Sequence, residues 1–233
     1  MSRYNPKVAV HSYTQINAPY PMTIKQLIAY YARVSNPENR EMPPEDDKLV
    51  DYLMKHGHIS PFEMVSFCLF IDGTARDVSH QFLRHSELRV QEFSQRYAIV
   101  YDDPIVREAR WADPKNRQNS FDIKEGNVIA ETWEALQRKG NKQAQDHYTW
   151  AITNGIAKEC ARVVLPEGNT STSLFAHGYL RSWIFYIQNR THESAQKEHQ
   201  YLAYLCAKAI SDIYPEIMNH VSPKCAERFQ AGF

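Results

Sequence analysis

Apolar and polar residues along this chain repeat with two different periods. A spacing of three to four residues places apolar side chains on one face of a helix. This spacing predicts helices over 23–35, 48–58, 75–87, 128–161, 174–190 and 194–214. Alternation and β-rich apolar runs predict strands over 65–73 and 90–100. Polar, proline-containing stretches predict loops over 36–47 and 103–121.

Local signals mark several ends of these elements. Thr23 is a candidate N-cap, Gly57 can end the second helix, and Gly155 interrupts the fourth. A turn is expected at Pro166 and Gly168. Since no linker divides residues 1–233, we predict one helix-rich α+β domain whose few strands lie early in the chain.

Composition narrows the function classes. Lys+Arg and Asp+Glu both number 27, so a broadly basic surface for nucleic acid or a membrane is not indicated. No apolar run is long enough to span a bilayer, and the start MSRYNPKVAV lacks the apolar core of a signal peptide. We therefore expect a cytoplasmic protein. The four cysteines form no CxxC pair, so no metal site is predicted. Glycine loops of the dinucleotide-fold and P-loop types are absent.

The stretch LRHSELRVQEFSQRY (83–97) carries candidate chemistry. In a strand, Glu92, Ser94 and Arg96 would point the same way. A hydroxyl beside a guanidinium can donate to phosphate oxygens, and a carboxylate can accept from sugar hydroxyls. Spacing alone favours equally a cradle for a nucleotide monophosphate and a solvated strand face with a Glu–Arg pair. Arg84 and His85 could hold a phosphate or a flavin edge, or could cap the preceding helix.

Extended back to Gln81, this stretch reads Q-x-x-R-H-x(8)-S-x-R-Y (81–97), which resembles the signature of flavin-dependent thymidylate synthases of the ThyX type. Further motifs follow in the order and spacing of that family. These are ARVS (32–35), HxSPFE (58–63), NRQNS (116–120), AKECARVVLP (157–166), LRSWIFYIQNR (180–190) and AQKEH (195–199). The resemblance covers residues 24–215.

The resemblance implies a small, mostly antiparallel sheet and a homotetramer with active sites between subunits. Each site would take FAD, the substrate dUMP, methylenetetrahydrofolate as one-carbon donor and NADPH as reductant. The implied reaction is reductive methylation of dUMP to dTMP, with hydride passing from flavin N5 to uracil C6. No protein nucleophile is required in this family.

Site residues are carried over position by position. The cofactor-binding set is Ser35, His58, Ser60, Glu63, Arg84, His85, Ser86, Glu92, Arg181 and Phe185. The dUMP-binding set is Gln81, Arg84, Glu92, Ser94, Gln95, Arg96, Arg162 and Arg190. Catalytic roles are implied for Arg190, which could stabilise charge on the uracil carbonyls, and for His58 beside the flavin.

Two departures from the family pattern change the chemical character of the side chain. Ser86 stands where the RHR motif has its second arginine, and Phe185 stands where members usually carry His or Asn. Arg89 could replace the missing cation in space. Besides tolerated drift, these changes leave open a related enzyme that hydroxymethylates dUMP or methylates another nucleotide such as UMP. They also leave open a non-catalytic flavin- or nucleotide-binding protein.

Overall fold

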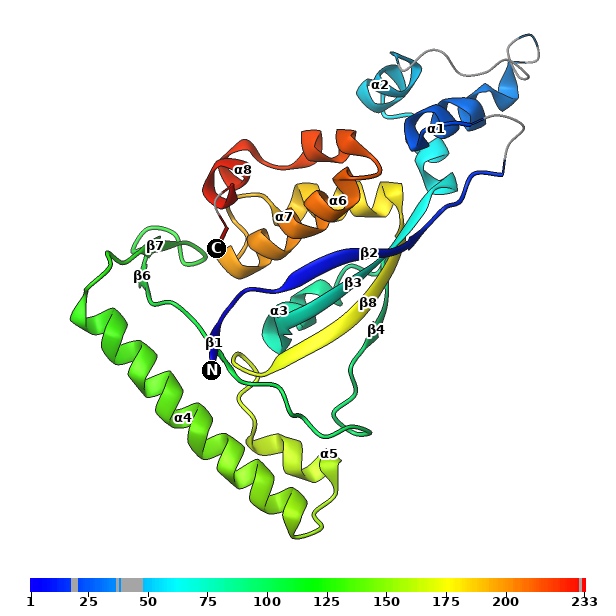
Figure 1. The fold of residues 1–233 in the computed structure, drawn as a ribbon. Coiled ribbons are helices and arrows are strands. Elements are labelled where there is room, and N and C mark those ends of the chain that lie inside the picture. The colour runs from blue at the N-terminus through cyan, green and yellow to red at the C-terminus, as the bar shows by residue number, and fades with distance from the viewer. Residues whose placement is uncertain (18–20, 37, 39–47, 231) are drawn as a thin grey trace.

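The computed structural model describes residues 1–17, 21–36, 38, 48–230 and 232–233 (Figure 1). The loop predicted over 36–47 therefore lies almost wholly outside the described residues. The helices are α1 (Ile24–Ala32), α2 (Lys48–Lys55), α3 (Arg76–Phe82), α4 (Val128–Thr153), α5 (Lys158–Ala161), α6 (Leu180–Arg190), α7 (Lys197–Ser211) and α8 (Pro223–Phe229). Short 3-10 turns are η1 (Arg33–Ser35), η2 (Ser60–Met64), η3 (Arg162–Val164) and η4 (Pro215–His220).

A four-stranded antiparallel sheet forms the centre, in the order β2 (Lys7–Tyr13), β3 (Ser66–Ala75), β8 (Ser171–Tyr179) and β4 (Arg89–Glu92). Two smaller pairs flank it: β1 (Ser2–Arg3) with β5 (Ile105–Val106), and the hairpin of β6 (Arg110–Ala112) with β7 (Ser120–Asp122). The predicted helix-rich α+β class with a small, mostly antiparallel sheet is confirmed.

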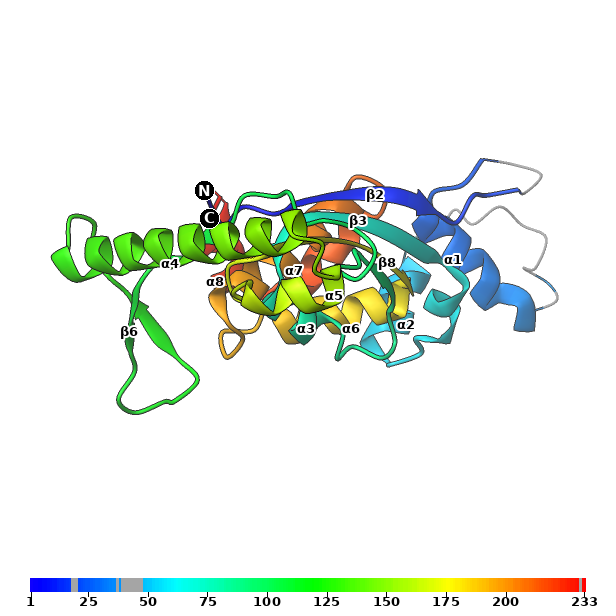
Figure 2. The ribbon, with the colours of Figure 1, turned by 90° about the horizontal axis from the view of Figure 1, so that it is seen from below.

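The sheet has one covered face and one open face. Phe67, Leu69 and Ile71 of β3 are fully buried, whereas the alternate residues Cys68 and Phe70 are half-buried. Helices α3, α6 and α7 lie on the buried side, and none of the helices that the structure describes covers the other side (Figure 2). The hairpin β6–β7 projects away from the body in the same view.

The expected ends of several helices are confirmed. Thr23 caps α1 through a capping box, in which its side chain accepts from Gln26 N at 3.2 Å and Gln26 Oε1 accepts from Thr23 N at 2.9 Å. Gly57 and Gly155 have φ of 72° and 79°, values at which glycine carries no Cβ penalty. They follow α2 and separate α4 from α5, as predicted.

The prediction of one helix over 174–190 is wrong in its first third. Residues 171–179 form β8, and the helix begins only at Leu180. Leu174, Ala176 and Gly178 are buried while Phe175 and Tyr179 are exposed, which is the two-residue period of a strand. An apolar run that short fits either period, and pairing with both β3 and β4 selects the strand.

The strand predicted over 90–100 is also too long, because β4 ends at Glu92. The chain then turns, and the Ser94 carbonyl accepts from the N–H groups of Tyr97 and Ala98, both at 3.1 Å. Glu92, Ser94 and Arg96 therefore do not share one strand face. The helix predicted over 75–87 likewise stops at Phe82, and Arg84 and His85 lie in the turn that follows.

Other elements carried weaker sequence signals. Strand β2, the short strands β5 to β7 and the C-terminal helix α8 were not predicted.

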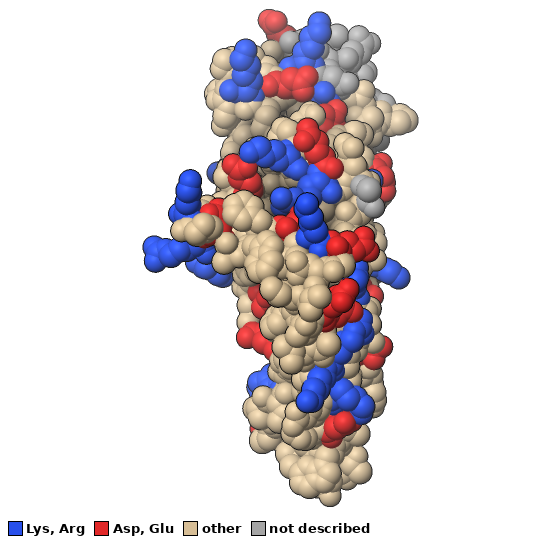
Figure 3. Space-filling model, turned by 90° about the vertical axis from the view of Figure 1, so that its left-hand side faces the viewer, with Lys and Arg blue, Asp and Glu red and all other residues tan. Residues whose placement is uncertain are grey.

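Among the described residues, no helix is long and apolar enough to cross a membrane. The part of the chain that the structure describes also holds no cluster of three His, Cys, Asp or Glu suited to a metal. Acidic and basic side chains are interspersed over the face in Figure 3, as the zero net charge suggests.

Candidate active site

Helix α6 presents two arginines to different neighbours. Arg181 and Arg190 are nine residues apart, so an unbroken helix places them roughly 180° from each other. Arg181, at the first turn, forms an ion pair with Glu63 of η2. Arg190, at the last turn, contacts His85 after α3. One helix therefore supplies a cation to two separate groups of predicted site residues.

The first group consists of predicted flavin contacts near η2. The Arg181 guanidinium lies 5.6 Å from the ring centroid of Phe185, one turn along α6, and also pairs with Glu63. Ser35 ends η1 and Ser60 begins η2, two elements joined through α1, and both side chains are exposed. His58 precedes η2 and is exposed as well. Phe185 thus supports the guanidinium with an aromatic face.

The second group centres on Arg190 and His85. Arg190 Nε donates to His85 Nε2 at 2.8 Å, so this ring nitrogen is the acceptor. His85 Nδ1 then carries the proton and donates to Glu87 Oε1 at 3.2 Å. The His85 ring stands edge-on to Tyr186, with centroids 5.0 Å apart. Burial, together with the nearby Arg190 charge, lowers the pKa of His85, although Glu87 opposes this. Neutral His85 therefore holds Arg190 without neutralising it.

The third group lies around the turn after β4. Gln95, Arg162, Arg76 and His80 line a cavity of about 380 Å³. Gln95 is 5% exposed, and its Nε2 has no hydrogen-bond partner within the described part of the chain. Arg96 N lies 3.4 Å from Ser94 Oγ, and Arg96 Nε donates to Glu159 Oε2 at 3.1 Å on the surface. An unpaired buried donor beside arginines fits an anionic, hydrogen-bonding ligand such as a nucleotide phosphate.

Glu92 does not share a strand face with Ser94 and Arg96, which corrects the strand-based prediction. Its Oε1 accepts from Ser79 Oγ at 2.6 Å and from Thr172 Oγ1 at 3.0 Å. It also lies 3.4 Å from Arg76 Nη1, and both side chains are largely buried. Glu92 thus holds Arg76, which lines the cavity and was missed from the sequence.

The turn that carries Arg84 is closely packed. Arg84 and Ser86 are exposed, and Arg89 Nη1 donates to the Ser86 carbonyl at 2.5 Å. The guanidinium of Arg89 therefore lies beside position 86, where the family motif has an arginine. A Cβ on Gly178 would lie 2.4 Å from Leu88 Cδ2, so this glycine allows β8 to approach the turn.

A buried hydrogen-bonded chain lies behind Gln81 and was also missed. It contains Tyr186, His199, Gln196 and Glu198, and it ends on Arg107 and Arg110. The motif AQKEH had been noted for its place in the family order, but no role was predicted for its residues. Nothing in a one-dimensional pattern shows that residues 81, 186 and 199 meet.

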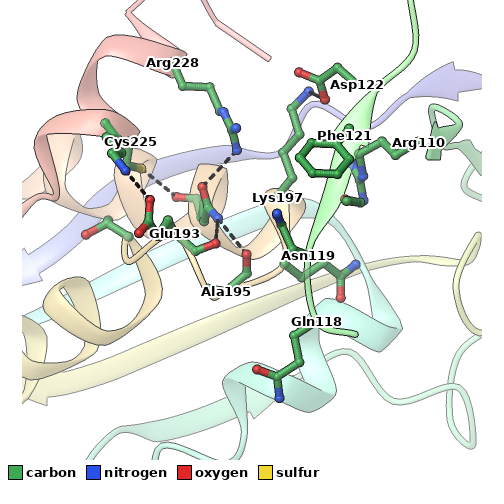
Figure 4. A pocket seen from close by; sticks show the side chains of 15 residues that line it. Arg110, Gln118, Asn119, Phe121, Asp122, Glu193, Ala195, Lys197, Cys225 and Arg228 are labelled. Atoms are coloured by element: carbon green, nitrogen blue, oxygen red, sulfur yellow. Dashed lines mark hydrogen bonds and ion pairs between the residues drawn. The ribbon is translucent and has the colours of Figure 1, made fainter. Parts of the chain in front are cut away.

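Gln196 also lines a cavity of about 470 Å³ (Figure 4). The hairpin β6–β7 forms one wall, and the start of α7 and part of α8 form the other. Its charged side chains are mostly paired, since Lys197 donates to Asp122 at 2.9 Å and Lys224 lies 2.5 Å from Glu193. None of the predicted site residues lines it.

Residues 20–216 match the family model described as thymidylate synthase complementing protein. The chain belongs to this family. A relative named probable flavin-dependent thymidylate synthase, from Paramecium bursaria Chlorella virus 1, is 43% identical over 197 residues, covering 84% of this chain and 89% of the relative. The flavin-dependent thymidylate synthase of Synechocystis sp. is 39% identical over 198 residues, with the same coverage of both chains.

A solved structure shares the fold of this chain. A UMP/dUMP methylase, PolB from Streptomyces cacaoi, bound with 5-Br dUMP, superposes with a TM-score of 0.79. The alignment covers 95% of this chain and 99% of PolB at 22% identity, which supports the fold alone. Family membership, predicted from the motifs, is confirmed, and the curated relatives are named for the predicted activity.

Proposed function

We propose that this chain is a flavin-dependent thymidylate synthase that converts dUMP to dTMP in the cytoplasm, with methylenetetrahydrofolate as one-carbon donor and NADPH as reductant. The names of its curated relatives support the reaction class. The observation that carries the proposal is the contact between Arg190 and neutral His85. Among the described residues, Arg190 has no carboxylate within ion-pair distance, so its charge is available to a substrate.

Arg190 is the residue proposed to act on the base. Developing negative charge on the uracil carbonyls would be stabilised by its guanidinium, which keeps free N–H donors after Nε has bonded to His85. His85 fixes the guanidinium in place and contributes no compensating negative charge. Preorganised donors of this kind are worth about 100- to 1,000-fold in rate.

The remaining assignments divide between phosphate and flavin. Ser94, Gln95, Arg96 and Arg162 would hold the nucleotide phosphate and sugar around the cavity with the unpaired Gln95 amide. Arg181, Glu63, Phe185, Ser60, Ser35 and His58 would hold the flavin, with Arg84 and His85 between the two ligands. A bound flavin would supply the hydride that completes the methyl group. Arg181, braced by Phe185, would orient that cofactor.

The active site is proposed to lie between subunits of a homotetramer. Within one chain, no hydrogen bond or ion pair of the described residues joins the Arg190–His85 pair to the Arg96–Arg162 group. The open sheet face carries Phe70 and Phe175 with ring centroids 4.8 Å apart, and Phe175 is 38% exposed. An exposed aromatic sheet face is suited to burial against another copy.

Subunit mixing tests this arrangement. Arg190→Gln, through kcat, and Arg96→Ala, through dUMP binding, should each lower the activity of a homo-oligomer measured at limiting dUMP. Co-expression of the two variants should restore part of the activity, because some mixed interfaces carry both wild-type arginines. If both residues serve the same site from one chain, the mixed preparation is no more active than its parents.

Mass spectrometry of the nucleotide tests the reaction itself. The protein is incubated anaerobically with FAD, NADPH, methylenetetrahydrofolate and dUMP, with UMP and dCMP in parallel. The expected result is a methyl group gained on dUMP. A hydroxymethyl product, or turnover with UMP alone, would instead assign changed chemistry to Ser86 and Phe185. Nucleotide binding without any product would identify a non-catalytic binding protein.

A further inference from the structure

The buried chain behind Gln81 has a fixed hydrogen-bond direction. Gln196 Nε2 donates to Glu198 Oε2 at 2.9 Å, and Gln81 Nε2 donates to Gln196 Oε1 at 2.7 Å. His199 Nδ1 lies 3.3 Å from Gln81 Oε1, and Tyr186 Oη lies 3.2 Å from His199 Nε2. His199 and Glu198 are 0% and 1% exposed, and Gln81 and Gln196 between them are half-buried.

The direction follows from the acid at one end. An ionised carboxylate only accepts hydrogen bonds, so the Gln196 amide must turn its NH₂ towards Glu198. Its carbonyl oxygen then faces Gln81, which must donate through Nε2. Gln81 Oε1 is left to accept from His199 Nδ1–H, and His199 Nε2 accepts from the Tyr186 hydroxyl. Each group fixes the orientation of the next.

Glu198 is held ionised by two arginines. Arg110 Nη2 donates to both of its oxygens, at 2.9 and 3.0 Å, and Arg107 Nη1 lies 3.8 Å away. Burial alone would raise the pKa of Glu198, but these charges and the Gln196 hydrogen bond lower it below its usual range. Burial and the nearby Arg190 and His85 lower the pKa of His199, which keeps the ring neutral and able to accept.

Gln81 is left with one free N–H and one free lone pair, in a fixed order. A carboxamide can pair with either pyrimidine amide edge by flipping. Uracil presents O4 as acceptor beside N3–H as donor, whereas cytosine presents an N4 donor beside the N3 acceptor. Here a flip would set Gln81 Nε2 against His199 Nδ1–H and Oε1 against Gln196 Oε1. A locked amide can therefore match only one of the two bases.

We infer that the chain Glu198–Gln196–Gln81–His199–Tyr186 is a specificity device that locks the Gln81 amide so that the site accepts a uracil nucleotide and rejects its cytosine counterpart. Gln196 and His199 are positioning residues, since they act through Gln81. The inference rests on the proposed function for one step, the contact of Gln81 with the nucleotide base.

The test compares the affinities of dUMP and dCMP by calorimetry. Gln196→Leu cuts the link to Glu198 but leaves the Glu198–arginine cluster in place. The expected result is a dCMP-to-dUMP dissociation-constant ratio that falls by about tenfold, the lower range for one bidentate base contact. His199→Phe should reduce the same ratio, and His199→Asn, which keeps a donor near the Nδ1 position, should restore it.

Gln200→Leu is the matched control. Gln200 is a buried glutamine of the same helix, bonded to the Ala195 carbonyl and to Arg228 but outside the chain. It should change stability without changing the ratio. If Gln196→Leu and His199→Phe fold and keep the wild-type ratio, the inference is overturned. If Gln81→Leu leaves dUMP affinity unchanged, the proposed contact of Gln81 with the base is wrong.

Discussion

The pair Arg107 and Arg110 lies at one end of the polar chain behind Gln81, and the single Arg190 lies near the other end. The two ends differ in how their charge is balanced. Arg107 and Arg110 share the buried Glu198, and Arg107 also pairs with Asp77 while Arg110 pairs with Glu108. Arg190 contacts only neutral His85, and among the described residues no carboxylate pairs with it. The charge of Arg107 and Arg110 is balanced by carboxylates of the chain itself. Arg190 has a positive charge that no carboxylate of the described residues neutralises.

On the proposed function, this difference would separate structural arginines from arginines that bind the substrate. A buried cation that already has its carboxylate contributes to folding, and removing either partner is costly. A cation whose hydrogen-bond partner is neutral keeps a charge that can attract an anionic ligand. Arg162 and Arg84 resemble Arg190, since no carboxylate partner is found for them in the described part of the chain. All three were predicted to contact the nucleotide.

The largest expected effect is on stability. Arg110→Met should lower the unfolding free energy by about 3 kcal/mol, because it leaves buried Glu198 with only the more distant Arg107. Chemical denaturation measures this. Arg3→Met is the control, since the exposed pair with Glu134 should contribute less than about 1 kcal/mol. Equal losses in the two variants would remove the distinction between the two ends.

The next effect is on rate. Arg190→Gln should lower kcat for dUMP by about 100-fold, because one preorganised donor to the developing charge is lost. The unfolding midpoint should stay close to that of the wild type, since no ion pair is broken. Single-turnover kinetics and thermal unfolding measure the two quantities. A variant that unfolds early yet keeps its rate would place Arg190 with the structural arginines.

Arg96 is intermediate between arginines that have a buried carboxylate partner and arginines that have none, because it pairs with Glu159 on the surface. Arg96→Ala should weaken dUMP binding by about 1.5–3 kcal/mol, the range for hydrogen bonds to charged groups. Glu159→Gln is the matched variant and should leave binding equal or tighter, since it frees the guanidinium. Unchanged dUMP affinity in Arg96→Ala, measured by calorimetry, would remove this residue from the phosphate site.

Acidification should lower the free energy of unfolding through His85 and His199, which lie near Arg190. The folded-state pKa values of His85 and His199 are both lowered, chiefly by burial, so the folded protein binds fewer protons than the unfolded chain. Their contribution to stability is complete above about pH 6.5, the unfolded value, and is lost as the pH falls towards the folded values. Denaturation at several pH values measures it. His85→Asn should flatten the profile, and an unchanged slope would contradict the assignment of His85.

The smallest expected effect concerns Ser86. Arg89 already places a guanidinium beside this position, so Ser86→Arg should change flavin affinity by about twofold or less, as surface substitutions usually do. Flavin fluorescence quenching measures it. Arg89→Ala is the comparison and should weaken flavin binding more. A large gain from Ser86→Arg would show that Arg89 does not replace the missing arginine.

Much of the fold could be predicted from the sequence because caps and glycines act locally. Thr23, Gly57 and Gly155 mark ends that the structure confirms. Strand β8 was read as helix because its apolar run fits both periods until the pairing partners are known. Strand β2 was missed because an exposed edge strand has no strong apolar alternation.

For the candidate site, the sequence named residues, and the structure supplied the contacts between them. The motif resemblance named Arg190, His85 and Gln95, which the structure holds in buried or cavity-lining contacts. Strand periodicity wrongly aligned Glu92 with Arg96, since the turn at Ser94 breaks the period. His199 was missed because it contacts Gln81, which lies more than a hundred residues away in the sequence. Arg76 was missed because its position depends on its ion pair with Glu92.

The most direct test of the account is a calorimetric comparison of dUMP with deoxyuridine, at low and at moderate salt. If arginines without carboxylate partners mark the substrate site, loss of the phosphate should weaken binding by at least about tenfold, and added salt should reduce the difference. Equal affinities for dUMP and deoxyuridine would contradict the central claim, because the unbalanced charge would then have no anionic ligand.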